Sequence, residues 1–130
     1  MNYLGQFKRK EGFRLTFNKP ILASFTILEI QGENVEAKTT GSFYISDMSL
    51  KGAKIISTHQ FHTPNTLIKM ECVITDQQLE IVGELIWGKQ GYKEYLYGMV
   101  FNPQTYSKQK LLEELKKYVI KNKSSNKNGG

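Results

Sequence analysis

The fold class is decided by the stretch Leu67-Ile68-Lys69-Met70-Glu71-Cys72-Val73-Ile74. Its even-numbered positions are apolar, whereas Lys69 and Glu71 stand between them. Because successive side chains of a β-strand point to opposite faces, this period of two predicts a strand that buries one face. Cys72 belongs to the apolar set, so we expect it in the core.

Two segments closer to the C-terminus repeat this alternation. Their apolar sets, which we expect to face the core, are Leu79, Ile81, Leu85 and Trp87 in the first segment and Tyr95, Tyr97, Met99 and Phe101 in the second. Less regular strand-like runs cover residues 13–17, 21–30, 35–39, 43–45 and 53–57. Turn-forming residues such as Asn18-Lys19-Pro20 separate the runs. Many short strands at hairpin spacing predict an all-β sandwich or barrel.

The period of the apolar residues changes after Asn102-Pro103. An apolar stripe at helical spacing then predicts an amphipathic helix over about residues 107–121; its members are Leu111, Leu112, Leu115, Tyr118 and Val119. Packing of this stripe on its own domain is the simplest expectation, and dimerisation is the alternative. The last residues, 122–130, have almost nothing apolar to bury, so we expect a disordered tail.

Length and composition indicate one small domain, since 130 residues with 39% hydrophobic content can build a single core. No run of about 18 apolar residues exists to span a membrane. The polar start, residues 1–10, lacks the apolar region of a signal peptide, so we expect a cytoplasmic protein. A single cysteine, which cannot form an internal disulfide, agrees with a reducing compartment.

Two polar segments carry the chemistry: Asp47-Met48-Ser49-Leu50-Lys51-Gly52 and the basic stretch that ends at Arg14. Asp47 and Ser49 are two residues apart, so in an extended strand both side chains reach the same ligand. A carboxylate only accepts hydrogen bonds, and the Watson–Crick edge of guanine presents two donors that adenine lacks. Arginine can bond guanine or bind a phosphate through two N–H groups. Gly52 permits a positive φ and a close backbone approach.

In order and spacing, these residues resemble the PilZ family over about residues 8–103. The family's DxSxxG turn is matched by Asp47, Ser49 and Gly52, and Arg14 matches the last position of its RxxxR segment. Lys10 stands at the first position of RxxxR, and Arg9 precedes it. The resemblance implies a six-stranded antiparallel β-barrel with one C-terminal α-helix.

The resemblance also implies a domain organisation and a function. Residues 1–14 form a basic arm that closes over a ligand, residues 8–103 the barrel, residues 104–121 the helix and residues 122–130 the tail. The protein is expected to be a non-catalytic bacterial receptor that binds cyclic di-GMP and relays this signal to a protein effector. The implied binding residues are Arg9, Lys10, Arg14, Asp47, Ser49 and Gly52. Whether Lys10 or Arg9 fills the first basic position stays open, and so does the choice between monomer and dimer.

Two alternatives come from the charged residues. Lys10 keeps the charge of an arginine without its planar fork, so one alternative is a degenerate adaptor that does not bind nucleotide. The net charge is +6 and the basic residues gather at both ends of the chain. A basic barrel with many aromatic residues could instead bind single-stranded nucleic acid by stacking and phosphate contacts.

Catalytic and metal chemistry find little support in the sequence. Asp47, Ser49, His59 and His62 supply the residue types of a hydrolytic triad, but no nucleophile-elbow pattern is present. The two histidines have no cysteine nearby and no acidic partner before Glu71, so they make a poor metal site. We therefore expect no enzyme activity, no metal and no cofactor.

Overall fold

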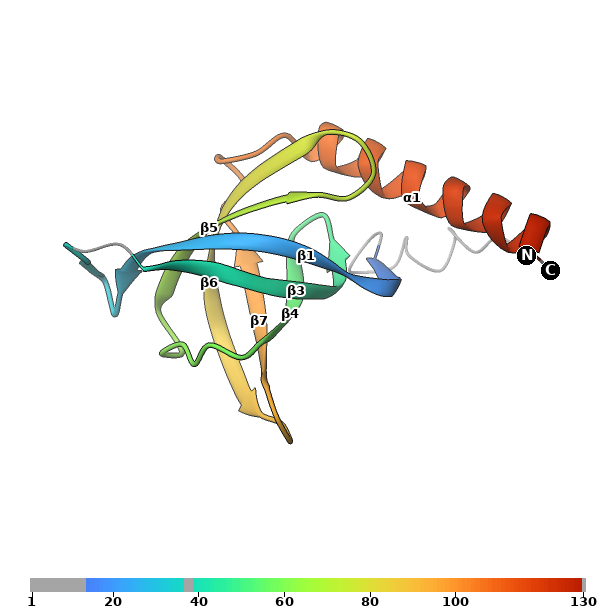
Figure 1. The fold of residues 1–130 in the computed structure, drawn as a ribbon. Coiled ribbons are helices and arrows are strands. Elements are labelled where there is room, and N and C mark those ends of the chain that lie inside the picture. Colours follow the sequence, from blue (N-terminus) through green and yellow to red (C-terminus); the bar gives the residue numbers. More distant parts are fainter. Residues whose placement is uncertain (1–13, 37–38, 130) are drawn as a thin grey trace.

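The computed structural model describes residues 14–36 and 39–129, with side chains as far as Asn122 (Figure 1). Seven strands precede one helix in the described chain. Their bounds are β1 (Arg14–Ile30), β2 (Glu33–Asn34), β3 (Thr40–Ser49), β4 (Gly52–Ser57), β5 (Thr66–Val73), β6 (Gln78–Gln90), β7 (Tyr95–Phe101) and α1 (Lys108–Gly129).

The first strand closes the sheet into a barrel. β1 is 17 residues long and pairs with β3 along one side and with β5 along the other. The remaining strands follow in the order β3-β4-β7-β6-β5, all pairs are antiparallel, and the two-residue β2 pairs only with β1. The predicted six-stranded antiparallel barrel with a C-terminal helix is therefore confirmed.

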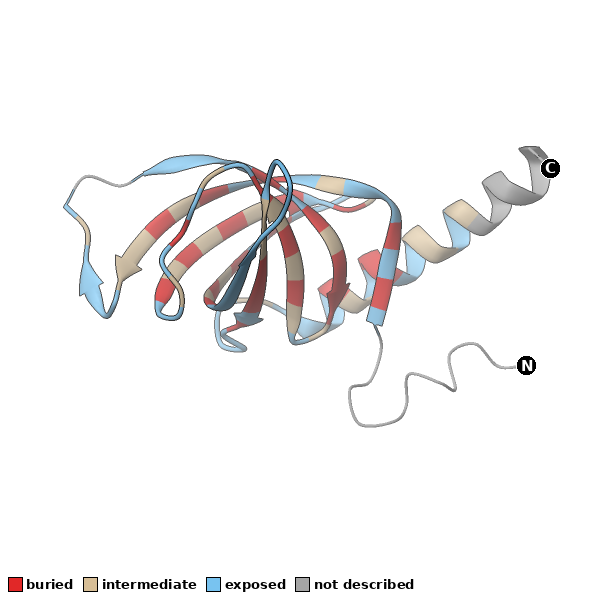
Figure 2. Cartoon of the chain, turned by 90° about the horizontal axis from the view of Figure 1, so that it is seen from below, coloured by how far each residue is buried: buried red, intermediate tan, exposed pale blue. Residues whose placement is uncertain are grey.

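The core is formed mainly from alternate positions of the long strands, as the red segments between tan and pale-blue ones in Figure 2 show. In β5 the predicted set is confirmed, since Ile68 and Met70 are fully buried and Cys72 nearly so. Burial raises the pKa of the Cys72 thiol to about 12, so the thiol stays protonated and unreactive.

Two predicted boundaries are wrong. The expected turn at Asn18-Lys19-Pro20 lies inside β1, where five residue steps from Thr16 to Ile21 match only two steps on β3. Proline has no N–H to donate to a strand partner, so β1 continues there as an irregular segment that does not pair with β3. The expected strand at residues 35–39 is also absent from its described part, because β3 begins only at Thr40.

Helix α1 packs its apolar stripe on the barrel, with Leu111 and Leu115 fully buried. Ser107 caps its start, since the N–H of Lys110 donates to the Ser107 hydroxyl at 3.1 Å. The helix continues to Gly129, although we expected it to end at residue 121 and to be followed by a disordered tail. No proline interrupts the added segment, so nothing in its covalent structure stops the helix.

A buried carboxylate fixes α1 to the turn between β5 and β6. The side chain of Glu114 is only 1% exposed, and its Oε1 accepts the N–H groups of Thr75, Asp76 and Gln77 as well as the Thr75 hydroxyl. Burial alone would raise the pKa of Glu114, but these hydrogen bonds outweigh it and lower the pKa to about 2. The ionised carboxylate is therefore the form that holds helix and barrel together.

We expect Glu114→Gln to lower the free energy of unfolding at pH 7 by on the order of 3 kcal/mol, since one pKa unit corresponds to about 1.4 kcal/mol. The folded-state pKa lies below the ordinary value of 4.5. The carboxylate's contribution is thus complete above pH 4.5 and is lost as the pH falls toward about 2. Urea unfolding across this range should show wild type and variant converging. Glu113→Gln, at an exposed neighbouring position, is the matched control and should change the free energy of unfolding little. A difference between wild type and Glu114→Gln that stays constant at all pH values would contradict the role of the ionised carboxylate.

Candidate functional site

The turn between β3 and β4 is built by the hydroxyl of Ser49. Its Oγ accepts the N–H groups of Lys51 and Gly52, each at 3.1 Å, which closes a tight turn. At Gly52 a Cβ would lie 2.5 Å from the carbonyl oxygen of Met99, so only glycine lets β4 approach β7 this closely. The expected close approach is thus present, but the φ of Gly52 is not positive.

A bulge at Ser46 turns Asp47 out of the barrel. Ile45 and Asp47 of β3 face Ile55 and Lys54, so β3 carries one residue more than β4 between these pairs. The buried positions of β3 change parity there, from odd-numbered Phe43 and Ile45 to even-numbered Met48, which is fully buried. Bulges of this kind re-aim side chains beside functional sites.

Asp47 then lies between two cations on neighbouring strands. The Arg14 guanidinium is 2.9 Å from Oδ1, and the Lys54 ammonium is 3.9 Å from Oδ2. Asp47 is nearly buried, whereas the side chains of Arg14 and Lys54 are 42% and 43% exposed. Pairs this exposed add only about 0–1 kcal/mol of stability, so their main effect is to fix where the two cations sit.

Trp87 also points outward, which corrects its predicted place in the core. β6 carries an extra residue between Leu85 and Trp87, so the alternation that buries Leu79, Ile81 and Leu85 breaks, and Trp87 is 41% exposed. Its indole lies over Gly98 of β7, where any Cβ would overlap the ring nitrogen. A tryptophan paired with a glycine on the neighbouring strand could have indicated this outward position. The pair can be recognised only once β6 is known to pair with β7.

Arg14, Lys54 and Trp87 line one cavity of about 470 Å³. One wall is cationic and includes Arg14, Lys51 and Lys54, and the other is apolar. The full lining is Arg14, Ser49, Lys51, Gly52, Ala53, Lys54, Ile86, Trp87, Gly98, Met99 and Val100. In the described part of the chain, no acidic side chain lines this cavity. The arrangement suits a ligand that combines negative charge with a flat ring.

The structure brings together four of the residues expected at the site. Arg14, Ser49 and Gly52 line the cavity, and Asp47 pairs with Arg14 and Lys54 without lining it. Arg9 and Lys10 lie outside the described residues, as does the rest of the expected arm before Arg14. Sequence reasoning missed Lys51, Lys54 and Trp87 as cavity residues.

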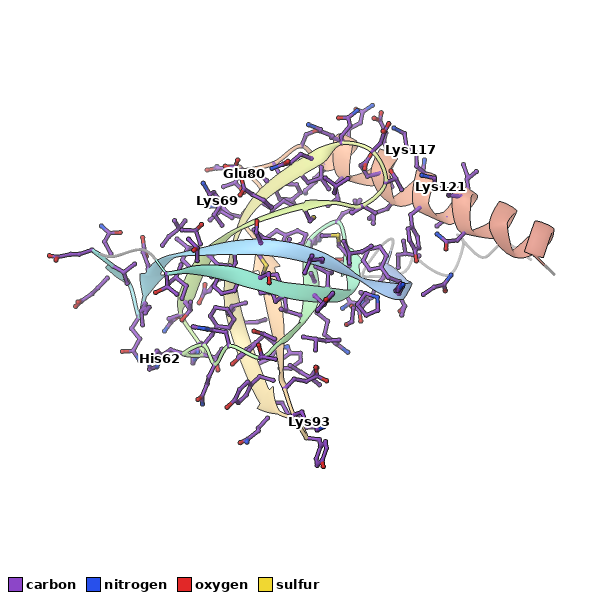
Figure 3. All side chains as sticks on the ribbon, viewed as in Figure 1. His62, Lys69, Glu80, Lys93, Lys117 and Lys121 are labelled. Carbon is purple, nitrogen blue, oxygen red and sulfur yellow. The ribbon has the colours of Figure 1, made fainter. Side chains whose placement is uncertain are left out.

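The other candidates lie elsewhere. His59 packs on Phe61 with ring centroids 4.6 Å apart, and His62 points outward from the loop between β4 and β5 (Figure 3). Within residues 14–36 and 39–129 no three His, Cys, Asp or Glu side chains are grouped to hold a metal ion. In that same part of the chain, α1 is not apolar enough over its length to cross a membrane.

Comparison with known proteins gives one family. The family model described as PilZ domain matches residues 8–119, which is most of the chain. A comparison with curated proteins finds no match.

We expect Gly98→Ala to displace the indole of Trp87 into solvent, because the added methyl group occupies the place of the ring. Trp87 is the single tryptophan of the chain, so its emission reports on the cavity directly. The variant should show red-shifted emission and stronger acrylamide quenching while the circular dichroism of the barrel is kept. Leu22→Ala, an exposed position on β1, is the control and should leave the emission unchanged. An unchanged spectrum in Gly98→Ala would contradict the placement of Trp87.

Proposed function

The chain belongs to the PilZ domain family, and we propose that it is a non-catalytic receptor that binds cyclic di-GMP and relays the bound state to a protein effector. PilZ domains are in general receptors for this dinucleotide. The observation that carries the proposal is the cavity beside the Ser49–Gly52 turn, with its cationic and aromatic walls.

Charge complementarity supports a ligand with two phosphates. Arg14, Lys51 and Lys54 place three positive charges on the lining, while Asp47, which pairs with Arg14 and Lys54, does not line the cavity. Part of this charge is offset by Asp47, so the net charge of the four residues is +2 at neutral pH. Cyclic di-GMP carries two negative charges on a compact ring, which matches this balance.

The apolar wall supports a ligand with flat bases. Trp87 offers a half-exposed indole face, and Ile86 and Val100 beside it are exposed to a similar extent. Stacking of a base on an aromatic side chain is worth about 1–3 kcal/mol. The Arg14 fork can in addition bond the O6 and N7 atoms of guanine. A guanine between Trp87 and Arg14 would use both features.

Asp47 has a different role in this proposal from the one expected on sequence grounds. Both of its oxygens face cations, so we assign it to positioning Arg14 and Lys54. Reading of the guanine edge by Asp47 stays a prediction, because ligand donors would have to compete with Arg14 for Oδ1. The contribution of Arg9 and Lys10 from the arm likewise stays a prediction.

We expect cyclic di-GMP to bind and to change the emission of Trp87, with GTP and cyclic di-AMP binding much more weakly. Calorimetric titration at near-physiological salt, paired with tryptophan fluorescence, measures both effects. Absence of binding up to about 1 mM ligand, a binding free energy of about 4 kcal/mol, would contradict this proposal. The degenerate adaptor that does not bind nucleotide would then take its place. The salt dependence separates nucleic acid from dinucleotide, because affinity for a polyanion falls steeply with salt whereas two phosphates give a shallow slope.

We expect Arg14→Ala to weaken cyclic di-GMP binding by about 2–4 kcal/mol, since it removes a charged group able to form two parallel hydrogen bonds. Arg14→Lys should recover only part of the loss, because lysine restores the charge without the fork. Lys19→Ala, an exposed cation on the same strand outside the cavity, is the control and should bind like wild type. Equal losses for Arg14→Ala and Lys19→Ala would show that only overall charge matters.

A further inference from the structure

Tyr106, in the connection between β7 and α1, contacts the Ser49–Gly52 turn that lines the cavity. Its hydroxyl donates a hydrogen bond to the carbonyl oxygen of Leu50, 56 residues earlier in the chain. Its ring packs edge-on against Phe101 at 5.5 Å, and the N–H of Phe101 donates to the carbonyl oxygen of Lys51 at 2.8 Å. The Leu50 carbonyl of the turn is thus bound by the connection to α1, and the next carbonyl, that of Lys51, by the last residue of β7.

Tyr118, three turns into α1, holds the strand that carries Arg14. Its hydroxyl accepts the N–H of Asn18 at 2.9 Å, and its ring packs edge-on against Phe17 at 5.0 Å. The side-chain amide of Asn18 also donates to Asn122 at 3.2 Å. Asn18 lies in the irregular part of β1 that does not pair with β3, so the helix takes the place of a strand partner there.

Tyr118 on α1 and Tyr106 just before it therefore contact two neighbouring segments on the cationic side of the cavity, the start of β1 and the Ser49–Gly52 turn. The third polar anchor, Glu114, binds the β5–β6 turn, which does not line the cavity. Beyond Asn122 the helix extends away from the strands (Figure 1), and Ile120 near this end is 67% exposed. A small change in helix orientation at either tyrosine contact would therefore move the C-terminal end of α1, which has no strand beside it.

We propose that Tyr106 and Tyr118 are positioning residues that couple the cavity to α1, so that occupation of the cavity changes how firmly α1 is held. The ligand-dependent part of this inference rests on the proposed function. Coupling between two sites is reciprocal, so loss of either hydroxyl also changes the affinity of the cavity for its ligand. The relay to an effector then runs through α1.

The first test measures amide hydrogen exchange along α1 with and without saturating cyclic di-GMP. In the wild type, the ligand should change exchange between Leu111 and Lys121 by about fivefold or more, a typical size for coupling between sites. Tyr106→Phe and Tyr118→Phe keep the rings but remove one hydrogen bond each, so both should still bind the ligand with a much smaller change in α1. Tyr92→Phe, at the tip of the β6–β7 hairpin and 93% exposed, is the control and should respond like wild type.

The second test needs no ligand. Ser49→Ala removes the hydroxyl that closes the turn, so it should speed exchange at the start of α1 in the wild-type background. It should not speed exchange further in the Tyr106→Phe background, where the hydrogen bond from Tyr106 to the turn is already absent. Exchange in β5, from Ile68 to Cys72, should stay constant in all variants, which separates coupling from global destabilisation.

The outcomes distinguish the two proposals. Unchanged α1 exchange in Ser49→Ala, or equal effects of Ser49→Ala in both backgrounds, overturns the coupling even where cyclic di-GMP binds. Loss of the Ser49→Ala effect in Tyr106→Phe supports the coupling even where the wild type fails to bind cyclic di-GMP, and only the proposed function then falls. Ligand binding that leaves α1 exchange unchanged in the wild type also overturns the coupling.

Discussion

The pairing of β1 with both β3 and β5 is the constraint on which the rest of the molecule depends. It closes the sheet, and side chains fill the interior of so small a barrel. A ligand of nucleotide size therefore has to bind on the outside. The same pairing places Arg14 opposite Ser49 and beside Asp47, 33 residues away. The β1–β3 part of this pairing therefore also assembles the cationic side of the candidate site.

Irregularities in the strands then decide which side chains face the outside. A regular β3 would keep the odd-numbered parity of Phe43 and Ile45 and would direct Asp47 into the core. The extra residue at Ser46 prevents this, and an extra residue before Trp87 does the same on β6. Both bulges act at the same level of the barrel, where Asp47, Lys54, Gly98 and Trp87 follow one another across β3, β4, β7 and β6. The cavity is a consequence of two local breaks in a regular pattern.

Helix α1 is held by apolar packing and by polar anchors, and the two kinds of contact have different consequences. Leu111 and Leu115 bury apolar surface, which stabilises docking without fixing direction closely. Hydrogen bonds from Tyr106, Glu114 and Tyr118 are directional, and each joins the helix region to a different turn or strand. A helix fixed in this way keeps a defined orientation relative to the cavity. This geometry underlies the proposed coupling between α1 and the cavity.

The sequence by itself determined the fold class and most of the core, because the alternation in β5 and the helical spacing of Leu111 and Leu115 are local properties of the chain. It also predicted Arg14, Asp47, Ser49 and Gly52 as site residues, since residue types and short spacings can be read without a fold. It placed Trp87 in the core and divided β1 at Pro20, because a bulge changes parity and pairing without leaving a clear mark in composition. Only the tertiary structure decided that Lys51, Lys54 and Trp87 line one cavity and that Tyr106 and Tyr118 contact the turn and the strand on its cationic side. Those relations depend on the register between strands and on contacts across 56 to 100 residues, which no local pattern encodes.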